Sequence, residues 1–220
     1  DVDITCLGFV AALDVASRYQ DKNKMKHIVV VCSEIASKGL NPESWETYTL
    51  FCDAAAAVVI SFDETAKSGM LYSDFKTYSS GVDFTEIKGG GNKYYLKDFP
   101  YNPELHSFKM EGIKLLRLAK KNLPAFFAEF FENVPIQLRD VHHIFPHQAS
   151  RMGLILMQDV LDMNPATIHT NLDEHGNCIS ASIPLLLAQT IEKNKITKGE
   201  TLLLCGTSAG FSIGAALLVY

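Results

Sequence analysis

The chain has 220 residues, of which 47% are hydrophobic and 20% charged, and its formal net charge is −5 at pH 7. These values are typical of a globular protein with a sizeable core. An acidic chain has no general electrostatic attraction to nucleic acid or to an anionic membrane surface. Its longest apolar run, Ala54 to Ile60 with its flanks, is far shorter than the ~20 residues that span a membrane. We therefore expect a cytoplasmic protein with no nucleic-acid or membrane partner.

The five cysteines are an odd number, show no C-x-x-C spacing and stand beside apolar or small residues. This pattern favours reduced thiols in a cytosolic protein over a disulfide framework. The chain starts without an initiator Met or a basic leader and opens as though in the middle of a strand. We therefore expect it to be a fragment or a processed product.

Periodicity and composition predict four elements up to Phe62. Val2–Thr5 is expected to be a short strand that runs into Cys6, and Val10–Tyr19 an amphipathic helix. The β-branched, nearly continuous run His27–Cys32 is typical of a strand buried on both faces. Ala54–Phe62 predicts another strand.

The middle of the chain is first polar and then helical. Residues 67–103, rich in Gly and Tyr, predict a hairpin followed by a long surface loop. Phe108–Phe131 is the longest helical pattern, and Pro124 is expected to kink it or split it in two. The later elements are expected to be a strand at Val141–Phe145, a helix at Arg151–Leu161, a loop at His169–Asn177, a helix at Ile183–Lys193 and a strand–loop–strand unit from Thr201 to Tyr220.

One pattern occurs twice in the chain. His27–Cys32 followed by Ala54–Ile60 resembles Thr201–Cys205 followed by Gly214–Val219, since each is an apolar strand ending in Cys, a loop and an Ala-rich strand. The match is short. It is either a coincidence or the trace of two similar α/β units that pack against each other.

Three residues are candidates for chemistry. Cys6 lies between a strand and an apolar helix, where a helix N-terminus can lower a thiol pKa from ~8.5 to about 3.5–7.5; the alternative is a small buried hydrophobe. His147 follows a buried strand, at the rim of a sheet where doubly wound folds place their sites, and is otherwise structural. Asn177, which follows a glycine before a predicted helix, is either functional or an N-cap.

A small-residue loop, Gly206–Phe211, offers backbone N–H groups to an oxyanion and lacks the pattern of a phosphate loop. The acidic residues Asp173 and Glu174 beside His175 suggest a metal, but no ligand spacing such as H-E-x-x-H supports one. We expect no metal.

Together these motifs resemble the β-ketoacyl-ACP synthase III family of thiolase-superfamily condensing enzymes. A cysteine at a strand–helix junction is followed by P-H-Q-A, then by H-G-N with small residues and Pro. The terminal A-G-F-S-I-G-A-A-L-L-V-Y resembles the closing strand of that family. The resemblance covers essentially the whole chain and is strongest in residues 1–63 and 141–220.

The resemblance implies an α/β, thiolase-like fold with layers in the order αβαβα and two related halves. Residues 1–66 would be the C-terminal part of the first half, carrying the nucleophile. Residues 67–220 would be the second half, carrying the histidine and the asparagine. The family also has a segment before its cysteine that is absent here, so a missing N-terminal segment and a second copy in a homodimer are implied partners.

The resemblance also implies a reaction. Cys6 would take an acyl group from acyl-CoA, and His147 and Asn177 would hydrogen-bond the carbonyl of a malonyl carrier while its decarboxylation forms an enolate. That carbanion would attack the acyl group in a Claisen condensation, with the N–H groups of Cys6 and Ala209, in the loop Ser208–Gly210, as oxyanion hole. Acyl-CoA and the malonyl thioester are substrates, no cofactor is implied, and the pathway would be fatty-acid or polyketide-like synthesis.

An acyl carrier protein would be acidic and would need a basic surface. The leading carrier-binding candidates are Lys109 and Arg151, together with residues of the long predicted helix (Lys114, Arg117, Lys120 and Lys121). The alternative is an ordinary solvated helix face.

The chain departs from the family at two places. The family's F-G-D-G-A-G-A is here the run from Phe51 to Ala57, F-C-D-A-A-A-A, and its triple glycine is here Thr207–Gly210, T-S-A-G. No acyl-chain preference can therefore be carried over. Two other functions stay open: transfer of the Cys-bound acyl group to an alcohol or amine without decarboxylation, and a non-catalytic partner subunit.

Overall fold

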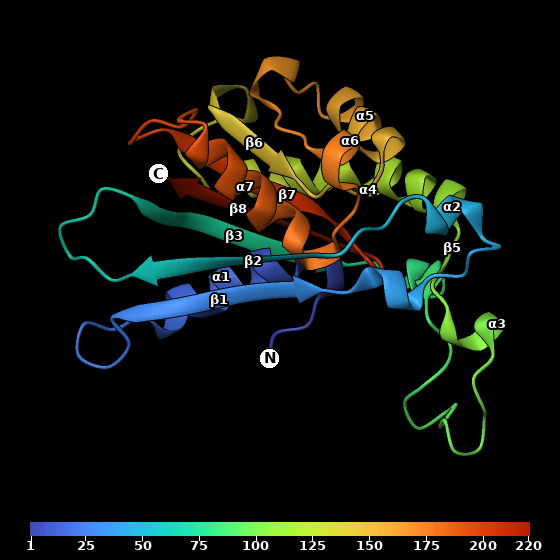
Figure 1. Ribbon diagram of the computed structural model, residues 1–220. Coiled ribbons are helices and arrows are strands. Elements are labelled where there is room, and N and C mark those ends of the chain that lie inside the picture. Colours follow the sequence, from blue (N-terminus) through green and yellow to red (C-terminus); the bar gives the residue numbers. More distant parts are fainter.

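The computed structural model describes all residues from Asp1 to Tyr220. Its centre is a four-stranded sheet in the order β3-β8-β7-β6 (Figure 1). β8 is antiparallel to both of its neighbours, whereas β6 runs parallel to β7. The strands of this sheet are β3 (Gly69–Thr77), β6 (His143–Pro146), β7 (Thr201–Ser208) and β8 (Ser212–Val219).

A separate antiparallel ribbon is formed by β1 (His27–Glu34) and β2 (Ala54–Ser61). The helices α1 (Gly8–Tyr19) and α7 (Ser182–Glu192) pack against this ribbon on one side and against the central sheet on the other. On the opposite face of the sheet lie α4 (Gly112–Glu132) and α5 (Arg151–Val160) (Figure 1). The layers therefore follow the order ribbon, helices, sheet, helices.

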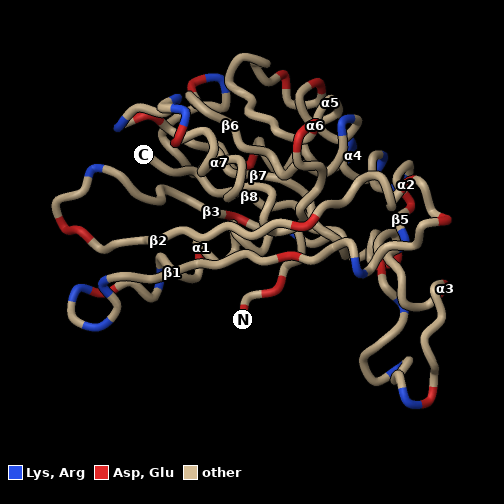
Figure 2. The backbone as a smooth tube through the Cα atoms, viewed as in Figure 1, with Lys and Arg blue, Asp and Glu red and all other residues tan.

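The core is divided between the two faces of the central sheet. Leu202 and Leu204 of β7 belong to the cluster shared with α1 and α7, whereas Leu203 and Cys205 belong to the cluster shared with α4. Since successive side chains point to opposite faces of a strand, a strand covered on both faces needs an unbroken apolar run. This requirement explains the sequence of β7 and of β8, neither of which carries a charged residue (Figure 2).

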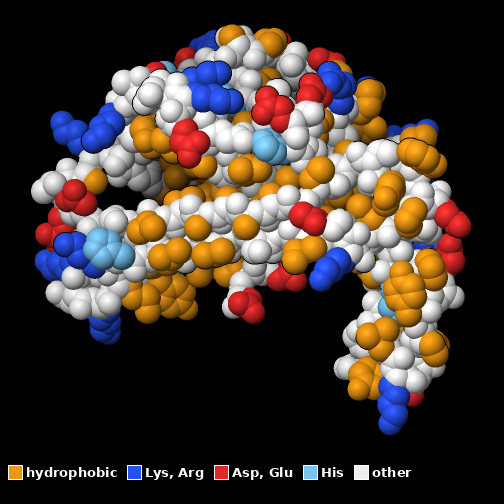
Figure 3. All heavy atoms as spheres, viewed as in Figure 1, with side chains coloured by type: hydrophobic (Ala, Val, Ile, Leu, Met, Phe, Trp, Pro, Cys, Tyr) orange, Lys and Arg blue, Asp and Glu red, His pale blue; other side chains and the backbone are white.

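The ribbon is covered on one face only. Burial alternates along β1 and β2, and the outward side chains Val29, Val31 and Val59 are 59–64% exposed. Figure 3 shows hydrophobic side chains along this face. The prediction that His27–Cys32 is buried on both faces is therefore wrong, because helices lie on only one side of the ribbon.

Short elements connect these layers. Two of them, β4 and β5, form a small antiparallel pair. Among the helices, none is long and apolar enough to cross a membrane. The short elements are α2 (Trp45–Tyr48), β4 (Thr85–Glu86), α3 (Pro103–His106), β5 (Lys109–Met110) and α6 (Leu172–His175).

Two predicted strand arrangements are wrong. Val2–Thr5 forms no strand, because the Thr5 N–H donates to the Asp3 carboxylate and the chain turns into the 3-10 segment Thr5–Leu7. The predicted hairpin of two strands does not form within residues 67–103: β3 pairs with the distant β8 along nearly its whole length, and the only antiparallel pairing inside the range is the single bridge between Gly90 and Tyr94. The predicted domain boundary after residue 66 stays a prediction.

The long helix also differs from its prediction. α4 is one uninterrupted helix that contains Pro124. Proline leaves the carbonyl four residues earlier, on Lys120, without its donor, and Lys120 is exposed. Water can therefore satisfy that carbonyl, and the helix continues.

Candidate active site

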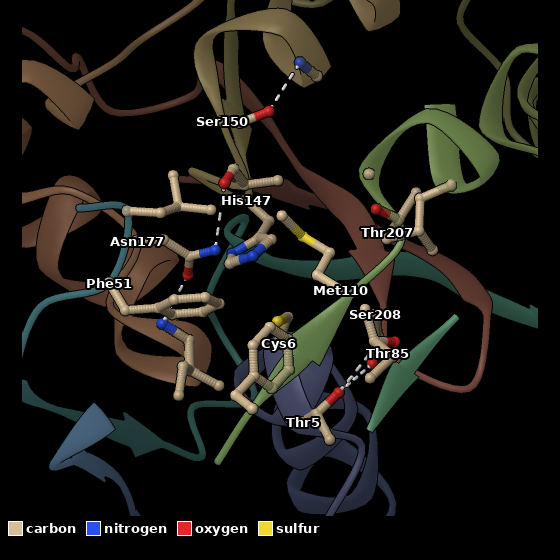
Figure 4. A pocket seen from close by; sticks show the side chains of 18 of the residues that line it. Thr5, Cys6, Phe51, Thr85, Met110, His147, Ser150, Asn177, Thr207 and Ser208 are labelled. Atoms are coloured by element: carbon tan, nitrogen blue, oxygen red, sulfur yellow. Dashed lines mark hydrogen bonds between the residues drawn. The ribbon is translucent and has the colours of Figure 1, made fainter. Parts of the chain in front are cut away.

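Cys6 lies in the turn Thr5–Leu7 and part of its surface reaches a cavity (Figure 4). Burial, followed by the nearby Glu34 carboxylate, raises the pKa of the Cys6 thiol to about 12. Its own backbone N–H acts in the opposite direction and is weaker. The predicted lowering of this pKa by a helix N-terminus is therefore wrong for this structure, because desolvation outweighs the dipoles near the sulfur.

His147 follows the last residue of β6 and is 2% exposed. Its backbone N–H donates to the Cys205 carbonyl at 2.7 Å, which continues the ladder with β7. Gly206 makes room for the ring, since a Cβ at this glycine would lie 2.5 Å from the His147 Cβ. This packing fixes where the imidazole enters the cavity.

The imidazole of His147 is held in its neutral form. Nδ1 is buried without a hydrogen-bond partner, and burial lowers the pKa of the ring to about 4. At neutral pH the ring therefore carries a single N–H. Because Nδ1 is enclosed by protein, only the tautomer with its hydrogen on Nε2 can donate a hydrogen bond to a substrate in the cavity.

The backbone of Asn177 is tied to the segment before β2. Its N–H donates to the Leu50 carbonyl at 2.9 Å, and its carbonyl accepts from the Cys52 N–H at 3.0 Å. The preceding Gly176 has φ +62°, and a Cβ there would lie 2.8 Å from the Leu50 carbonyl oxygen. The glycine of the H-G-N motif is therefore required by both its conformation and its close packing.

Two backbone groups orient the Asn177 amide. Oδ1 accepts from the Ile179 N–H at 2.9 Å, and Nδ2 donates to the Ala149 carbonyl at 3.2 Å. A backbone N–H can only donate and a carbonyl can only accept, so the orientation of the amide is defined. One N–H of Nδ2 is left for a substrate, and the same side chain braces the turn at Ile179.

A buried glutamine that sequence reasoning missed supports this arrangement. Gln148 is fully buried; its Nε2 donates to the Pro146 carbonyl at 2.8 Å, and its Oε1 accepts from the Thr170 hydroxyl at 2.8 Å. A buried amide is stable only when its donors and acceptors are paired. The signal that could have found it was the polar residue directly after His147 in an otherwise apolar run.

Cys6, His147 and Asn177 line one cavity of about 910 Å³. Figure 4 shows their side chains directed toward the same space from three different parts of the chain. The far wall is apolar and includes Leu116, Ala119 and Leu123 of α4 and Leu156 and Met157 of α5. The charged residues of the lining are all acidic: Asp3, Glu34, Glu46 and Glu86.

The predicted oxyanion loop is the turn between β7 and β8. Ser208 and Ala209 line the cavity, but Gly210, at the tip of the turn with φ +99°, does not. The Ala209 N–H donates to the Thr5 hydroxyl at 3.2 Å. Of the two predicted oxyanion donors, the Cys6 N–H has no acceptor on another residue, whereas the Ala209 N–H is occupied.

The two leading basic residues lie outside the cavity and are already paired. Lys109 forms an ion pair with Glu104, and Arg151 with Asp173, all of them on the surface. Lys114 pairs with Glu111, whereas Arg117, Lys120 and Lys121 form no ion pair. A carrier protein that binds Lys109 or Arg151 would have to displace an internal carboxylate.

Around the H-G-N motif, the polar side chains bind one another or neighbouring chain segments. His175 contacts Gln189 at 2.7 Å through Nε2, and Asp173 binds Arg151. The structure contains no group of three or more His, Cys, Asp or Glu side chains placed to hold a metal ion.

Two family models match the chain. The model described as 3-oxoacyl-[acyl-carrier-protein (ACP)] synthase III matches residues 1–79, and the model of its C-terminal part matches residues 131–220. Together they contain every residue of the candidate triad.

Curated proteins and solved structures agree with these matches. The chain is 30% identical over 221 residues to the β-ketoacyl-[acyl-carrier-protein] synthase III of Oleidesulfovibrio alaskensis, covering 99% of this chain and 67% of that protein. For the protein of that name from Clostridioides difficile the identity is 26% over 218 residues, covering 99% and 66%. The crystal structure of 3-oxoacyl-[acyl-carrier-protein] synthase III from Aquifex aeolicus VF5 has a TM-score of 0.84 at 27% identity and covers 98% of this chain and 65% of that one. The predicted thiolase-like α/β fold is thereby confirmed, and the chain spans about two thirds of the length of these relatives.

Proposed function

This chain belongs to the 3-oxoacyl-[acyl-carrier-protein] synthase III family, and on that premise we propose that it carries the catalytic residues of a condensing acyltransferase. The observation that supports the proposal is the convergence of Cys6, His147 and Asn177 on one cavity. The proposed substrates are an acyl-CoA and a malonyl thioester on CoA or an acyl carrier protein, in fatty-acid or polyketide-like synthesis. A homodimer stays a prediction.

In the first half-reaction the Cys6 sulfur attacks the thioester carbonyl of acyl-CoA. A new C–S bond to Cys6 forms as the bond to the CoA sulfur breaks, and CoA leaves with the proton that Cys6 gives up. Sulfur suits this step because it is both a nucleophile and a leaving group. Burial keeps Cys6 as a thiol in the resting state, so we expect loss of its proton to be coupled to substrate binding.

In the second half-reaction a malonyl thioester loses carbon dioxide, and the electron pair of the broken C–C bond stays on the substrate as an enolate. The N–H of neutral His147 and the free N–H of Asn177 would stabilise the enolate oxygen. The carbanion attacks the acyl carbonyl, a C–C bond forms, and Cys6 leaves as a thiolate that regains a proton from water.

The shape of the cavity supports an acyl substrate. Its volume of about 910 Å³ lies near the upper end of the ~300–1,000 Å³ typical of small-molecule sites. Each buried methylene contributes about 0.8 kcal/mol, so the apolar wall of α4 and α5 favours a chain longer than acetyl. Ala119→Phe would place a larger side chain in the cavity and leave less room for the acyl chain, so it should shift the preference toward shorter acyl groups.

The decisive test separates the two half-reactions in the full-length protein. Acyl-CoA should add one acyl group to Cys6, seen by intact mass and peptide mapping, and Cys6→Ala should abolish it. The exposed Cys52 offers a matched control, and Cys52→Ser should still be acylated. His147→Ala should slow malonyl decarboxylation about 10²–10³-fold, as expected for loss of one oxyanion donor. Acylation of another thiol, or unchanged decarboxylation, would contradict the proposal.

One observation favours a second candidate function. The Glu34 carboxylate lines the same cavity, raises the pKa of Cys6 and accepts a hydrogen bond from Ser180. Such a carboxylate could act as a general base for an alcohol or amine that takes the acyl group from Cys6. Release of carbon dioxide with formation of a ketoacyl product distinguishes condensation from this transfer.

A further inference from the structure

Four groups next to Cys6 form a continuous chain of hydrogen bonds. The Ala209 N–H donates to the Thr5 hydroxyl at 3.2 Å, the Thr5 and Ser208 hydroxyls are in close contact, and the Ser208 hydroxyl donates to the Ile4 carbonyl at 2.7 Å. Figure 4 shows Thr5 and Ser208 joined at the edge of the cavity. The segment before Cys6 is thereby attached to the β7–β8 turn.

The direction of this chain follows from the number of hydrogens. The Ile4 carbonyl can only accept, so the single hydrogen of the Ser208 hydroxyl is used there. Thr5 must therefore donate its hydrogen to Ser208, and the Thr5 oxygen is left to accept from Ala209. Every donor in the chain is committed, including the Ala209 N–H, which is one of the two predicted oxyanion donors.

Thr5 is held in this place against a backbone cost. Its φ is +39°, a conformation that a β-branched residue rarely adopts. Besides the contacts with Ser208 and Ala209, its N–H donates to the Asp3 carboxylate at 3.1 Å. Such strain persists only where the surroundings over-determine it, and it is concentrated at functional sites.

We infer that Thr5 closes the oxyanion hole of the substrate-free protein by occupying the Ala209 N–H. The inference rests on the proposed function, because it assigns the Ala209 N–H to the thioester oxygen of acyl-Cys6. When the acyl group arrives, its carbonyl oxygen competes with the Thr5 hydroxyl for this donor. Thr5 acts through Ala209 and is therefore a positioning residue that tunes the reactivity of the bound thioester.

Substitution of Thr5 in the full-length protein tests the hydroxyl without changing the shape of the side chain. Thr5→Val keeps the β-branch and removes the acceptor, so acylation of Cys6 should be about fivefold faster, the rate equivalent of one net hydrogen bond. Thr5→Ser keeps the hydroxyl and should behave like the parent. Thr77→Val is a matched control, since Thr77 forms a similar hydroxyl pair with Ser212 at 2.8 Å outside the cavity.

A spectroscopic measurement reports the hydrogen bonds directly. The infrared carbonyl band of ¹³C-labelled acyl-Cys6 should lie at lower wavenumber in Thr5→Val than in the parent, because a second donor reaches the carbonyl. Thr5→Ser and Thr77→Val should leave the band where the parent has it. An unshifted band with an unchanged acylation rate in Thr5→Val would overturn the inference.

A measurement on the substrate-free protein keeps this inference distinct from the proposed function. Amide hydrogen exchange of Ala209 should be about fivefold faster in Thr5→Val, and equal to the parent in Thr77→Val. A parent protein that is never acylated would contradict the proposed function. Equal exchange of Ala209 in parent and Thr5→Val would instead contradict the role given to Thr5. Thr5→Ala supplies the same readouts if the valine variant does not fold.

Discussion

Two antiparallel strand pairs, β1–β2 and β7–β8, each join an apolar strand containing a cysteine to an Ala-rich strand. Cys32 lies opposite Ala56 in the first pair, and Cys205 lies opposite Ala215 in the second. Helices cover both faces of β7–β8 but only one face of β1–β2. The same local pattern is therefore compatible with full or half burial, and the neighbouring layers decide between them.

The difference in burial has a counterpart in function. The fully buried pair holds the candidate site in place, because Gly206 of β7 packs against His147 and the turn after Ser208 contacts Thr5. The half-buried ribbon contributes Glu34, at its end, to the cavity lining. We therefore expect changes around β7–β8 to reduce stability and activity more than changes in the ribbon β1–β2. Four measurements can check this expectation.

The largest effect is expected in the core of β7. Leu203 is fully buried between the sheet and α4, so Leu203→Ala should reduce the free energy of unfolding by about 2–5 kcal/mol. Urea unfolding of the full-length protein measures it, with Val59→Ala on the exposed face of β2 as control. Equal losses for both variants would mean that the two pairs are buried alike.

Acid should destabilise the sheet next. The pKa of His147 is about 4 in the folded state because of burial, against 6.5 for the free side chain, and burial with nearby His143 and Lys195 lowers that of His169 to about 4 as well. Between pH 6.5 and 4 the unfolded chain binds more protons, so stability falls as pH falls through this window. His147 alone should account for about 3 kcal/mol.

Unfolding curves at pH 7, 5.5 and 4 check this expectation. His147→Gln should reduce the loss of unfolding free energy between pH 7 and pH 4. The part of that loss that comes from His169 should remain. A parent protein equally stable at pH 7 and pH 4 would show that neither ring is held neutral by its surroundings.

A smaller effect is expected where the sheet supports the site. Gly206→Ala brings a methyl group against His147, and such overpacking typically costs about 1–3 kcal/mol. Because the imidazole must move, the rate of decarboxylation should fall by a larger factor than the equilibrium constant of folding. Ala57→Val, a small-to-large change on the exposed face of β2, is the control and should be near neutral in both measurements.

The smallest effect is expected on the outer face of the ribbon. Val31 is 64% exposed, so Val31→Thr should change the free energy of unfolding by no more than about 0.5 kcal/mol. Urea unfolding of the full-length protein is the measurement. A loss well above 1 kcal/mol would show that something covers this face in the full-length protein.

The sequence predicted the regular elements that local pattern controls. The helices α1, α5 and α7 lie within a few residues of their predicted positions, and the two repeated strand pairs exist. The candidate site was also predictable, since Cys6, His147 and Asn177 each stand in a short motif and do line one cavity. The hydrogen-bond network of Gln148 was not, because its partner Thr170 belongs to a different segment.

By itself, the sequence determined the periodicity of helices and strands, the family motifs and the glycines that they require, because these depend on neighbouring residues and on steric rules of the backbone. Only the tertiary structure decided which strands meet, as in the pairing of β3 with β8, and which faces are covered. It also decided the protonation of Cys6 and His147, whose pKa values respond to burial, and the contact of Thr5 with Ser208, 203 positions apart. Desolvation and long-range hydrogen bonds arise only when distant segments pack together, so no local pattern contains them.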